Sequence, residues 1–204
     1  MLCPCLVSPM NHRLQRSVST TCPDSERRQR SAYTCLNISC YSYLQAYNYV
    51  RLASGTGTGN GPMISFHDGF EGTTNWAGFL PGADRIALDL HPYLCFATQS
   101  AASMSSRATE PCSSWAGMMN DSMTAFGLTS AGEFSNAIND CGLYVNGVGM
   151  GARYDGTYTS GGPWPKVGDC GQWIDYTSWD QTMKDSTKQF ALASMDALQV
   201  SLFS

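Results

Sequence analysis

The sequence predicts an α/β protein organised around a parallel sheet. Three short apolar runs, each ending in polar residues, alternate with segments whose apolar residues recur at helical spacing. The runs cover residues 63–67, 85–93 and 128–133. Because strands that alternate with helices form βα units, we expect the three strands to lie parallel, with the functional residues at their carboxyl ends.

Four helices are expected before, between and after these strands. Apolar residues from Tyr43 to Leu52 recur at helical spacing and stop at a Gly-rich turn. Further helices are expected over residues 115–126, over 136–145 with Ser135 as its N-cap, and over 181–199. Residues 154–179 are rich in Gly, Pro and aromatic side chains without a period, which predicts a long ordered loop.

Composition excludes several classes of function. The net charge of the 204 residues is -4, and no basic cluster of the kind that binds nucleic acid is present. No stretch approaches the 18 or so apolar residues of a membrane span. The chain has no Cys-x-x-Cys pair and no paired His spacing, so neither a metal site nor a cofactor is predicted. A length of 204 residues suits one folded domain.

The first forty residues differ in style from the rest. They hold five of the nine cysteines, and five Arg against Asp24 and Glu26 give them a charge of +3. The remaining residues hold seven Lys plus Arg against fourteen Asp plus Glu, which gives -7. No signal-peptide order of basic start and apolar run is visible at the N-terminus. We therefore expect a disordered leader over 1–40 and one folded part over 41–204.

Glu133 is the most conspicuous polar residue of the expected sheet edge. It is one of four glutamates and closes the third predicted strand behind a Gly. It fits a catalytic carboxylate, but equally a carboxylate that caps the next helix, and spacing alone leaves both interpretations open. His67 and His91 end the other two strands, where they fit general bases or hydrogen-bonded core residues.

Other motifs do not carry a function. Residues 147–152 match the Gly-x-Gly-x-x-Gly/Ala dinucleotide pattern, but they follow an expected helix instead of a strand. No Gly-x-Ser-x-Gly nucleophile turn is present. The five Trp residues fit sugar stacking, although each taken alone fits a core position better.

Three segments taken together resemble the fungal exo-β-1,3-glucanases of glycoside hydrolase family 5. Their order and spacing match over roughly residues 42–199, and the match continues through residues 145–149, 152–156 and 194–199. The three segments are Ile64-Ser65-Phe66-His67-Asp68-Gly69-Phe70, Ala87-Leu88-Asp89-Leu90-His91-Pro92-Tyr93 and Gly132-Glu133-Phe134-Ser135-Asn136-Ala137-Ile138-Asn139-Asp140-Cys141.

The resemblance implies a fold and a set of roles. The family fold is a (β/α)₈ barrel, of which this chain would hold the C-terminal part, about strands 5 to 7. Glu133 matches the nucleophile, His91 and Tyr93 match the groups that support it and bind sugar, and Phe96 matches an aromatic wall. Cys141 and Cys170 match a disulfide. The implied partner is a β-glucan, and the implied location is extracellular or the cell wall.

One expected group is missing. Retaining glycosidases use two carboxyl groups about 5 Å apart, one as nucleophile and one as acid and base. The resembling family supplies the acid from an Asn-Glu-Pro-like segment, and this sequence contains no Asn-Glu pair. We therefore expect a fragment with little activity alone. The alternatives are a non-catalytic carbohydrate-binding module, or a structural piece that docks on a complementary half-barrel. The sequence does not predict the oligomeric state.

Overall fold

The computed structural model describes residues 37–199, which form two compact units. Of the described residues, one unit comprises 37–90 and 118–130, and the other comprises 91–117 and 131–199. The sequence led us to expect one folded part. Residues 1–36 of the predicted leader lie outside the described residues, and helix α2 (Asn37–Ser54) begins at Asn37, inside the segment assigned to that leader.

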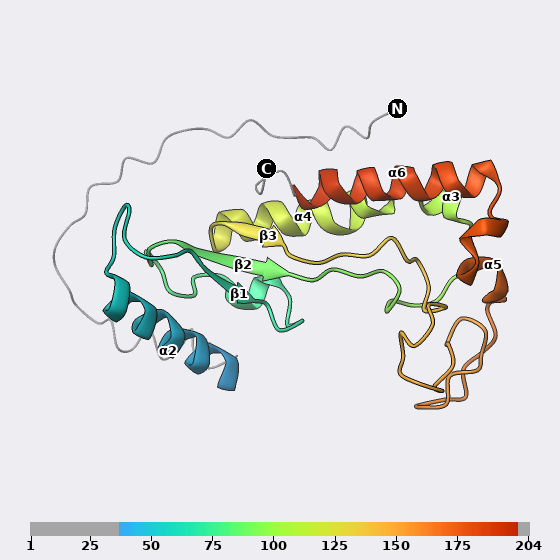
Figure 1. Ribbon diagram of the computed structural model, residues 1–204, viewed down its shortest axis with the longest axis horizontal. Coiled ribbons are helices and arrows are strands. Elements are labelled where there is room, and N and C mark those ends of the chain that lie inside the picture. Colours follow the sequence, from blue (N-terminus) through green and yellow to red (C-terminus); the bar gives the residue numbers. More distant parts are fainter. Residues whose placement is uncertain (1–36, 200–204) are drawn as a thin grey trace. The chain divides into compact units, whose positions relative to one another are not determined.

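The first unit is built on a three-stranded sheet in the order β1-β2-β3 (Figure 1). Strand β1 (Ile64–His67) pairs in parallel with β2 (Ile86–Leu90). Strand β3 (Thr129–Ala131) extends the sheet next to β2, and the N–H of Leu88 donates to the carbonyl of Leu128 at 2.9 Å. All three predicted strands are present, each shorter than predicted, and the parallel pairing of β1 with β2 is confirmed.

The register of β1 and β2 brings their carboxyl ends to the same edge. Ile64 lies opposite Ile86, and His67 lies opposite Asp89. The N–H of Asp68 donates to the carbonyl of Asp89 at 2.9 Å, so the pairing continues one residue beyond β1. The polar residues that directly follow β1 and β2 therefore lie at the same edge of the sheet.

Helix α2 ends where the sequence changes to a Gly-rich turn. Gly55 adopts a positive φ of 76°, a conformation that costs a side-chain-bearing residue energy, and its N–H donates to the carbonyl of Arg51 at 2.9 Å. The Arg51 guanidinium donates to the carbonyls of Pro62 at 2.9 Å and Asp84 at 2.8 Å. The end of the helix is thus tied to the loops that lead into both strands.

Aromatic side chains form the core of this unit. Tyr43 of α2 lies 5.0 Å from Phe66 of β1 and 5.5 Å from Trp76, measured between ring centroids. Phe79 meets Phe66 and Trp76 edge to face at 5.9 and 5.2 Å. Trp76 closes a short 3-10 helix, η1 (Thr73–Trp76), and is completely buried. Edge-to-face aromatic pairs add about 0.5–1.5 kcal/mol each to area burial, so Phe79 is held against Phe66 and Trp76, while the tilted contacts of Tyr43 join α2 to this cluster.

The second unit is organised by helix α6 (Gln181–Leu198), which runs beside α3 (Met104–Arg107) in Figure 1. Trp115 of helix α4 (Glu110–Ala125) meets Phe190 of α6 edge to face at a centroid distance of 6.4 Å. Helix α4 begins five residues before its predicted start. Its early start is possible because proline at the second helical position, where the backbone N–H has no intrahelical partner, does not break a helix.

Helix α6 agrees with its prediction and carries clear end signals. The carboxylate of Asp180 accepts a hydrogen bond from the N–H of Met183 at 2.7 Å, which is the bond of a helix N-cap. At the other end Gln199 takes a left-handed conformation with φ 54°. Phe190, Ala193 and Ala197 are buried at helical spacing, so one face of α6 belongs to the core.

The helix predicted over residues 136–145 is absent, and this prediction was wrong. The segment is irregular, and its polar side chains bond to the backbone instead. The Asn139 amide oxygen accepts from the N–H of Cys141 at 3.2 Å, and Ser135 Oγ accepts from the N–H of Ala137 at 3.1 Å. Such local bonds compete with a helical ladder. Tyr144 also has a positive φ of 66°, which no helix contains.

The long loop predicted over residues 154–179 is mostly irregular, as expected. Two short helical turns lie at its end, α5 (Gly171–Ile174) and η2 (Tyr176–Ser178), which the sequence pattern did not predict. None of the helices in the part of the chain that the structure describes has the length and hydropathy needed to cross a bilayer.

Candidate active site

Glu133 lies two residues beyond the end of β3, with 60 % of its side-chain surface exposed. Since residues 132–145 contain no helix, Glu133 does not cap one, and the helix-cap interpretation is wrong. A carboxylate held at a strand end and open to solvent can meet a ligand directly. The structure thus excludes the helix-cap role for Glu133.

Two side chains that follow β2 contact the Glu133 carboxylate. The hydroxyl of Tyr93 donates a hydrogen bond to Oε1, and Nδ1 of His91 lies 3.7 Å from Oε2. His91 is largely buried, with 24 % of its side chain exposed. The loop after β2 therefore positions both oxygens of the carboxylate, which is what a group that must attack from one direction requires.

The environment of Tyr93 keeps its phenol protonated. Burial, the hydrogen bond to Glu133 and the negative charge of that carboxylate raise the pKa of Tyr93 to about 12. At neutral pH the phenol is therefore a hydrogen-bond donor to Glu133, never a competing anion. A neutral donor stabilises the ionised carboxylate without neutralising it.

An exposed aromatic side chain extends the site outward. Phe96 meets Tyr93 edge to face at a centroid distance of 5.5 Å, and 51 % of its surface is exposed. It forms part of a cavity of about 360 Å³, which we call the Phe96–Trp164 cleft. The cleft is lined by Phe96, Ala97, Thr98, Gln99, Arg153, Trp164, Pro165 and Val167.

Arg153 joins the walls of this cleft. Its guanidinium donates to the carbonyls of Phe96 at 3.2 Å and Cys95 at 3.1 Å, and its Nε donates to Oδ2 of Asp140 at 3.0 Å. The Arg153 Cζ lies 5.8 Å from the ring centroid of Trp164, within the range of a cation–π contact. Arg153 thus holds the loop that carries Phe96 against the loop that carries Trp164.

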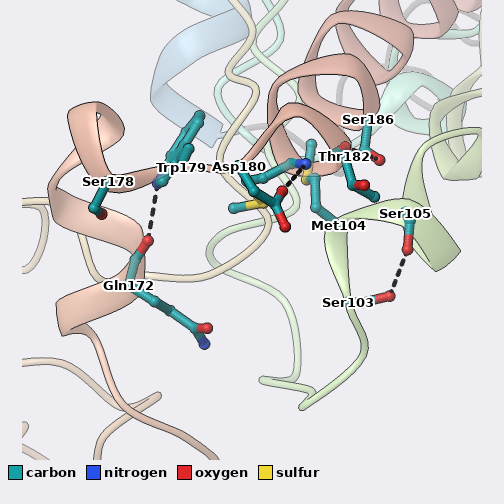
Figure 2. Close-up of a pocket in the computed structure, with 10 residues that line it drawn as sticks. Ser103, Met104, Ser105, Gln172, Ser178, Trp179, Asp180, Thr182 and Ser186 are labelled. Atoms are coloured by element: carbon teal, nitrogen blue, oxygen red, sulfur yellow. Dashed lines mark hydrogen bonds between the residues drawn. The ribbon is translucent and has the colours of Figure 1, made fainter.

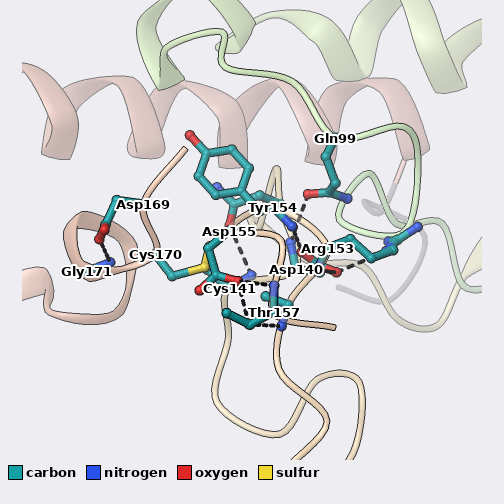
Figure 3. The surroundings of a disulfide bond; sticks show 12 residues. Gln99, Asp140, Cys141, Arg153, Tyr154, Asp155, Thr157, Asp169, Cys170 and Gly171 are labelled. Atoms are coloured by element: carbon teal, nitrogen blue, oxygen red, sulfur yellow. Dashed lines mark hydrogen bonds and ion pairs between the residues drawn. A yellow bond between two sulfur atoms is a disulfide. The ribbon is translucent and has the colours of Figure 1, made fainter. Parts of the chain in front are cut away.

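The carboxylate that pairs with Arg153, Asp140, is buried. Figure 3 shows it beside Arg153 and Tyr154. Asp140 accepts hydrogen bonds from the Asn146 amide at 2.9 Å and from the backbone N–H groups of Arg153 and Tyr154 at 2.9 and 3.0 Å. Burial acts to raise the pKa of Asp140, but these hydrogen bonds and the Arg153 side chain outweigh it and hold that pKa below its usual value. Asp140 is therefore a charged structural brace.

Next to this brace, Cys141 and Cys170 form a disulfide with a Cα–Cα distance of 5.2 Å (Figure 3). It is the pair that the family resemblance implied. The bond joins residues 29 apart and closes a loop that contains both Arg153 and Trp164. The aromatic loop is thereby anchored at both ends beside the buried Asp140.

Curated relatives of the chain share one activity in their names. A glucan 1,3-β-glucosidase of Lachancea kluyveri is 31 % identical over 163 residues, which are 78 % of this chain and 35 % of that protein. Glucan 1,3-β-glucosidase I/II of Saccharomyces cerevisiae is 30 % identical over 76 % of this chain and 34 % of its own length. A probable glucan 1,3-β-glucosidase D of Aspergillus clavatus is 37 % identical over 47 % of this chain and 12 % of its own length.

The chain is a relative of the fungal glucan 1,3-β-glucosidases. It spans about a third of the length of the first two of these relatives. No family model matches the chain.

The polar residues that the sequence predicted at the strand ends lie in two different units of the chain. His91, Tyr93 and Glu133 are brought together in one unit, with Phe96 beside them. His67 and Asp68 belong to the other unit, where they build a turn: His67 Nδ1 accepts from the N–H of Gly69 at 2.9 Å, and the buried Asp68 Oδ1 accepts from Phe70 at 3.1 Å. Their local bonds favour a structural role.

Asp140 and Arg153 were missed as candidates for the site, and Trp164 was considered for sugar stacking with the other tryptophans but was judged to fit a core position better. Asp140 and Arg153 stand in segments that carry the resemblance to the glucosidases, but nothing in their spacing indicates that they form an ion pair. Trp164 stands in an aperiodic loop. Among residues 37–199, no group of three or more His, Cys, Asp or Glu side chains is arranged to hold a metal ion.

Proposed function

We propose that the chain carries the nucleophile part of a retaining β-1,3-glucan hydrolase site of the glycoside hydrolase family 5 type. Glu133 would attack the anomeric carbon, so that a new C–O bond forms as the glycosidic bond breaks and the leaving oxygen takes a proton from an acid. Water would then hydrolyse the glycosyl-enzyme, and Glu133 would leave as the carboxylate. The observation that carries the proposal is the contact of Tyr93 and His91 with the two Glu133 oxygens.

The neighbouring groups fit this chemistry. Tyr93 donates to the attacking carboxylate in the ground state, and the same bond stabilises Glu133 as a leaving group in the second step. Phe96 and Trp164 offer aromatic faces for the apolar C–H surface of a glucosyl ring, and we assign the Phe96–Trp164 cleft to the sugar on the leaving-group side.

The mechanism also needs a general acid that protonates the leaving oxygen. The relatives act on β-1,3-glucan by name, yet this sequence has no Asn-Glu pair of the kind expected to supply the proton. Without a positioned acid the natural alkoxide leaving group departs slowly, because general acid catalysis contributes about 10²–10⁴-fold. We therefore propose that the chain alone hydrolyses β-1,3-glucan poorly.

The fold is proposed to be the part of a (β/α)₈ barrel that holds about strands 5 to 7. The parallel pairing of β1 with β2 and the sequential order of the sheet support this assignment. Strand β1 lies at the edge of the sheet within residues 37–199, and a complementary chain that supplies the remaining strands would extend the sheet there. Co-expression with such a chain should raise both the yield of soluble protein and the rate of glucan hydrolysis.

The nucleophile can be tested independently of the acid. A 2-deoxy-2-fluoro-β-glucoside with a dinitrophenolate leaving group needs no protonation to depart, and it traps the glycosyl-enzyme. We expect mass spectrometry of the purified chain to find one glucosyl adduct, on Glu133, while hydrolysis of laminarin stays close to background. Glu133→Gln should form no adduct.

Glu71→Gln is the matched control, since Glu71 is an exposed glutamate of the other unit. It should be labelled at the wild-type rate. An adduct on any residue other than Glu133 would overturn the nucleophile assignment, and fast laminarin hydrolysis by the chain alone would overturn the argument about the acid.

A second candidate function is carbohydrate binding without turnover. The Phe96–Trp164 cleft favours this function, because two aromatic side chains line it and binding there does not require Glu133 to react. Saturable binding of β-1,3-glucan oligosaccharides together with an absence of any adduct on Glu133 would support this function over hydrolysis.

We propose an extracellular or cell-wall location for the chain. The Cys141–Cys170 disulfide supports it, because disulfides persist in oxidising compartments and are rare in the cytosol. Secretion into the medium of a fungal host, with the disulfide detected in the secreted protein, is the expected result. Retention of the chain in the cell with both thiols reduced would contradict it.

A further inference from the structure

A second cavity lies in the same unit, where the beginning of α3, the α5–η2 segment and the beginning of α6 meet (Figure 2). Its volume is about 320 Å³, and it shares no lining residue with the Phe96–Trp164 cleft. We call it the serine-rich pocket. Its lining includes Ser103, Ser105, Gln172, Trp179, Asp180 and Thr182.

The lining of the serine-rich pocket selects for an uncharged, hydroxyl-rich ligand. Apart from two methionines and one tryptophan, the lining residues carry hydroxyl groups, an amide and a single carboxylate. No lysine, arginine or histidine lines it, so an anion finds no counter-charge. A single carboxylate among hydroxyl groups is also a poor site for a metal ion.

Hydrogen-bonding capacity remains on these walls. One oxygen of Asp180 accepts the N-cap bond from Met183 at 2.7 Å, and an ionised carboxylate has about four acceptor positions. It can therefore accept from a vicinal diol as well. Ser105 Oγ hydrogen-bonds to Ser103 Oγ at 2.9 Å and keeps further acceptor capacity, whereas Ser103 Oγ is already engaged by the N–H and the hydroxyl of Ser106 at 3.2 and 3.3 Å. Thr182 places another hydroxyl on the wall formed by α6.

Trp179 supplies the apolar surface of the serine-rich pocket. Its indole Nε1 donates to the backbone carbonyl of Gln172 at 2.9 Å, which fixes the ring between α5 and the N-cap of α6 (Figure 2). The side chain is half-buried, so part of the ring surface stays accessible. An aromatic ring beside a carboxylate and hydroxyls matches the two faces of a sugar, one apolar and one polar.

We propose that the serine-rich pocket is a second carbohydrate site, distinct from the site at Glu133, with Trp179 against the ring and Asp180 and Thr182 bonded to hydroxyls. That its ligand is a β-1,3-linked glucose oligosaccharide rests on the proposed function. A site of this kind holds a polymeric substrate at a second point. This raises the effective concentration of the polysaccharide at the Glu133 site.

The test uses the full chain with Glu133→Gln, so that no oligosaccharide is consumed. Laminarihexaose is titrated while the indole N–H resonances of Trp179 and Trp164 are followed by NMR. We expect both resonances to shift saturably. Thr182→Val should weaken binding at Trp179 about threefold to tenfold, since one hydrogen bond is lost, and leave binding at Trp164 unchanged. Asp180→Asn, which keeps an N-cap residue, should do the same.

Thr187→Val is the matched control, because Thr187 also lies on α6 but does not line the serine-rich pocket. It should leave both titrations unchanged. A shift of Trp164 without one of Trp179 would overturn this inference and leave the proposed function standing. A shift of Trp179 alone would support the second site and count against the assignment of the Phe96–Trp164 cleft. An absence of shifts at both indoles would overturn the second site and also the assignment of the Phe96–Trp164 cleft.

Discussion

Tyr93 donates a hydrogen bond to one oxygen of Glu133, across 40 positions of sequence. The two residues come from the loops after consecutive strands, β2 and β3. With the neutral phenol on one oxygen and His91 at 3.7 Å from the other, the carboxylate is oriented while most of its surface stays open. This orientation is the main structural support for a nucleophilic role.

Removal of the Tyr93 hydroxyl should slow the reaction of Glu133. We expect Tyr93→Phe to lower the rate of labelling by the activated fluoroglucoside roughly tenfold or more, because one hydrogen bond to a charged group is lost. Tyr176→Phe, which removes an exposed hydroxyl in the same unit, is the control and should label normally. Equal rates for Tyr93→Phe and the parent chain would show that the bond does not assist attack.

Titration of Tyr93 should follow its raised pKa. The folded value of about 12 lies above the usual value of about 10, so the fold favours the protonated phenol. Its contribution to stability is therefore complete below about pH 10 and disappears as pH rises through about 12. NMR of the labelled Tyr93 ring should give a midpoint near the higher value, and Glu133→Gln should move the midpoint down. An ordinary midpoint in the folded parent chain would contradict the contact.

The Asp140 brace should be important for stability. Asp140→Asn leaves the guanidinium of Arg153 without its buried partner, and we expect a loss of about 3 kcal/mol in the free energy of unfolding. Asp196→Asn, at an exposed position of α6, is the control for the loss of one carboxylate and should unfold like the parent. Urea denaturation followed by near-UV circular dichroism measures both.

The stability of the folded chain should depend on pH because of the Asp140 carboxylate. Because the pKa of Asp140 is lower in the folded chain than its usual value, its contribution is present above about pH 4 and is lost as pH falls through the folded pKa. Urea midpoints at a series of pH values should fall at the acid end in the parent chain and fall less in Asp140→Asn. Parallel curves for the two proteins would contradict the prediction.

Loss of the disulfide should loosen the aromatic loop. The bond joins residues 29 apart, and a loop of this length corresponds to about 3 kcal/mol of stability in the chain-entropy account. We expect Cys170→Ser to lower the unfolding midpoint and to weaken oligosaccharide binding at Trp164. Cys112→Ser is the control, because it makes the same Cys-to-Ser change outside the Cys141–Cys170 bond.

Trp164 should affect binding of the leaving-group sugar but not the reaction of Glu133. Trp164→Ala is expected to weaken laminari-oligosaccharide binding about twofold to tenfold in the Glu133→Gln background. The same substitution in the parent chain should leave labelling by the fluoroglucoside unchanged, since that reagent has no second sugar to reach the cleft. A fall in the labelling rate would place Trp164 on the other side of the cleaved bond.

Local sequence patterns predicted the regular elements well. The Gly-rich run after α2, the apolar strands and the amphipathic α6 were recognised from periodicity and end signals, which depend on neighbouring residues only. The helix expected over 136–145 failed for a physical reason: Asn139 and Asp140 bond to the backbone and outcompete a helical ladder there. The same error had kept the helix-cap interpretation of Glu133 open.

The sequence by itself determined the strand–helix order, the position of Glu133 at a strand end and, through resemblance, the identities of His91, Tyr93 and Phe96 and the cysteine pair. Only the tertiary structure decided that Tyr93 bonds to Glu133, that Arg153 joins Asp140 to the Phe96 loop, and that Trp164 faces a shared cleft. Those contacts join residues from 13 to 58 positions apart. Such contacts depend on how loops of irregular conformation close against each other, and periodicity contains no information about that closure.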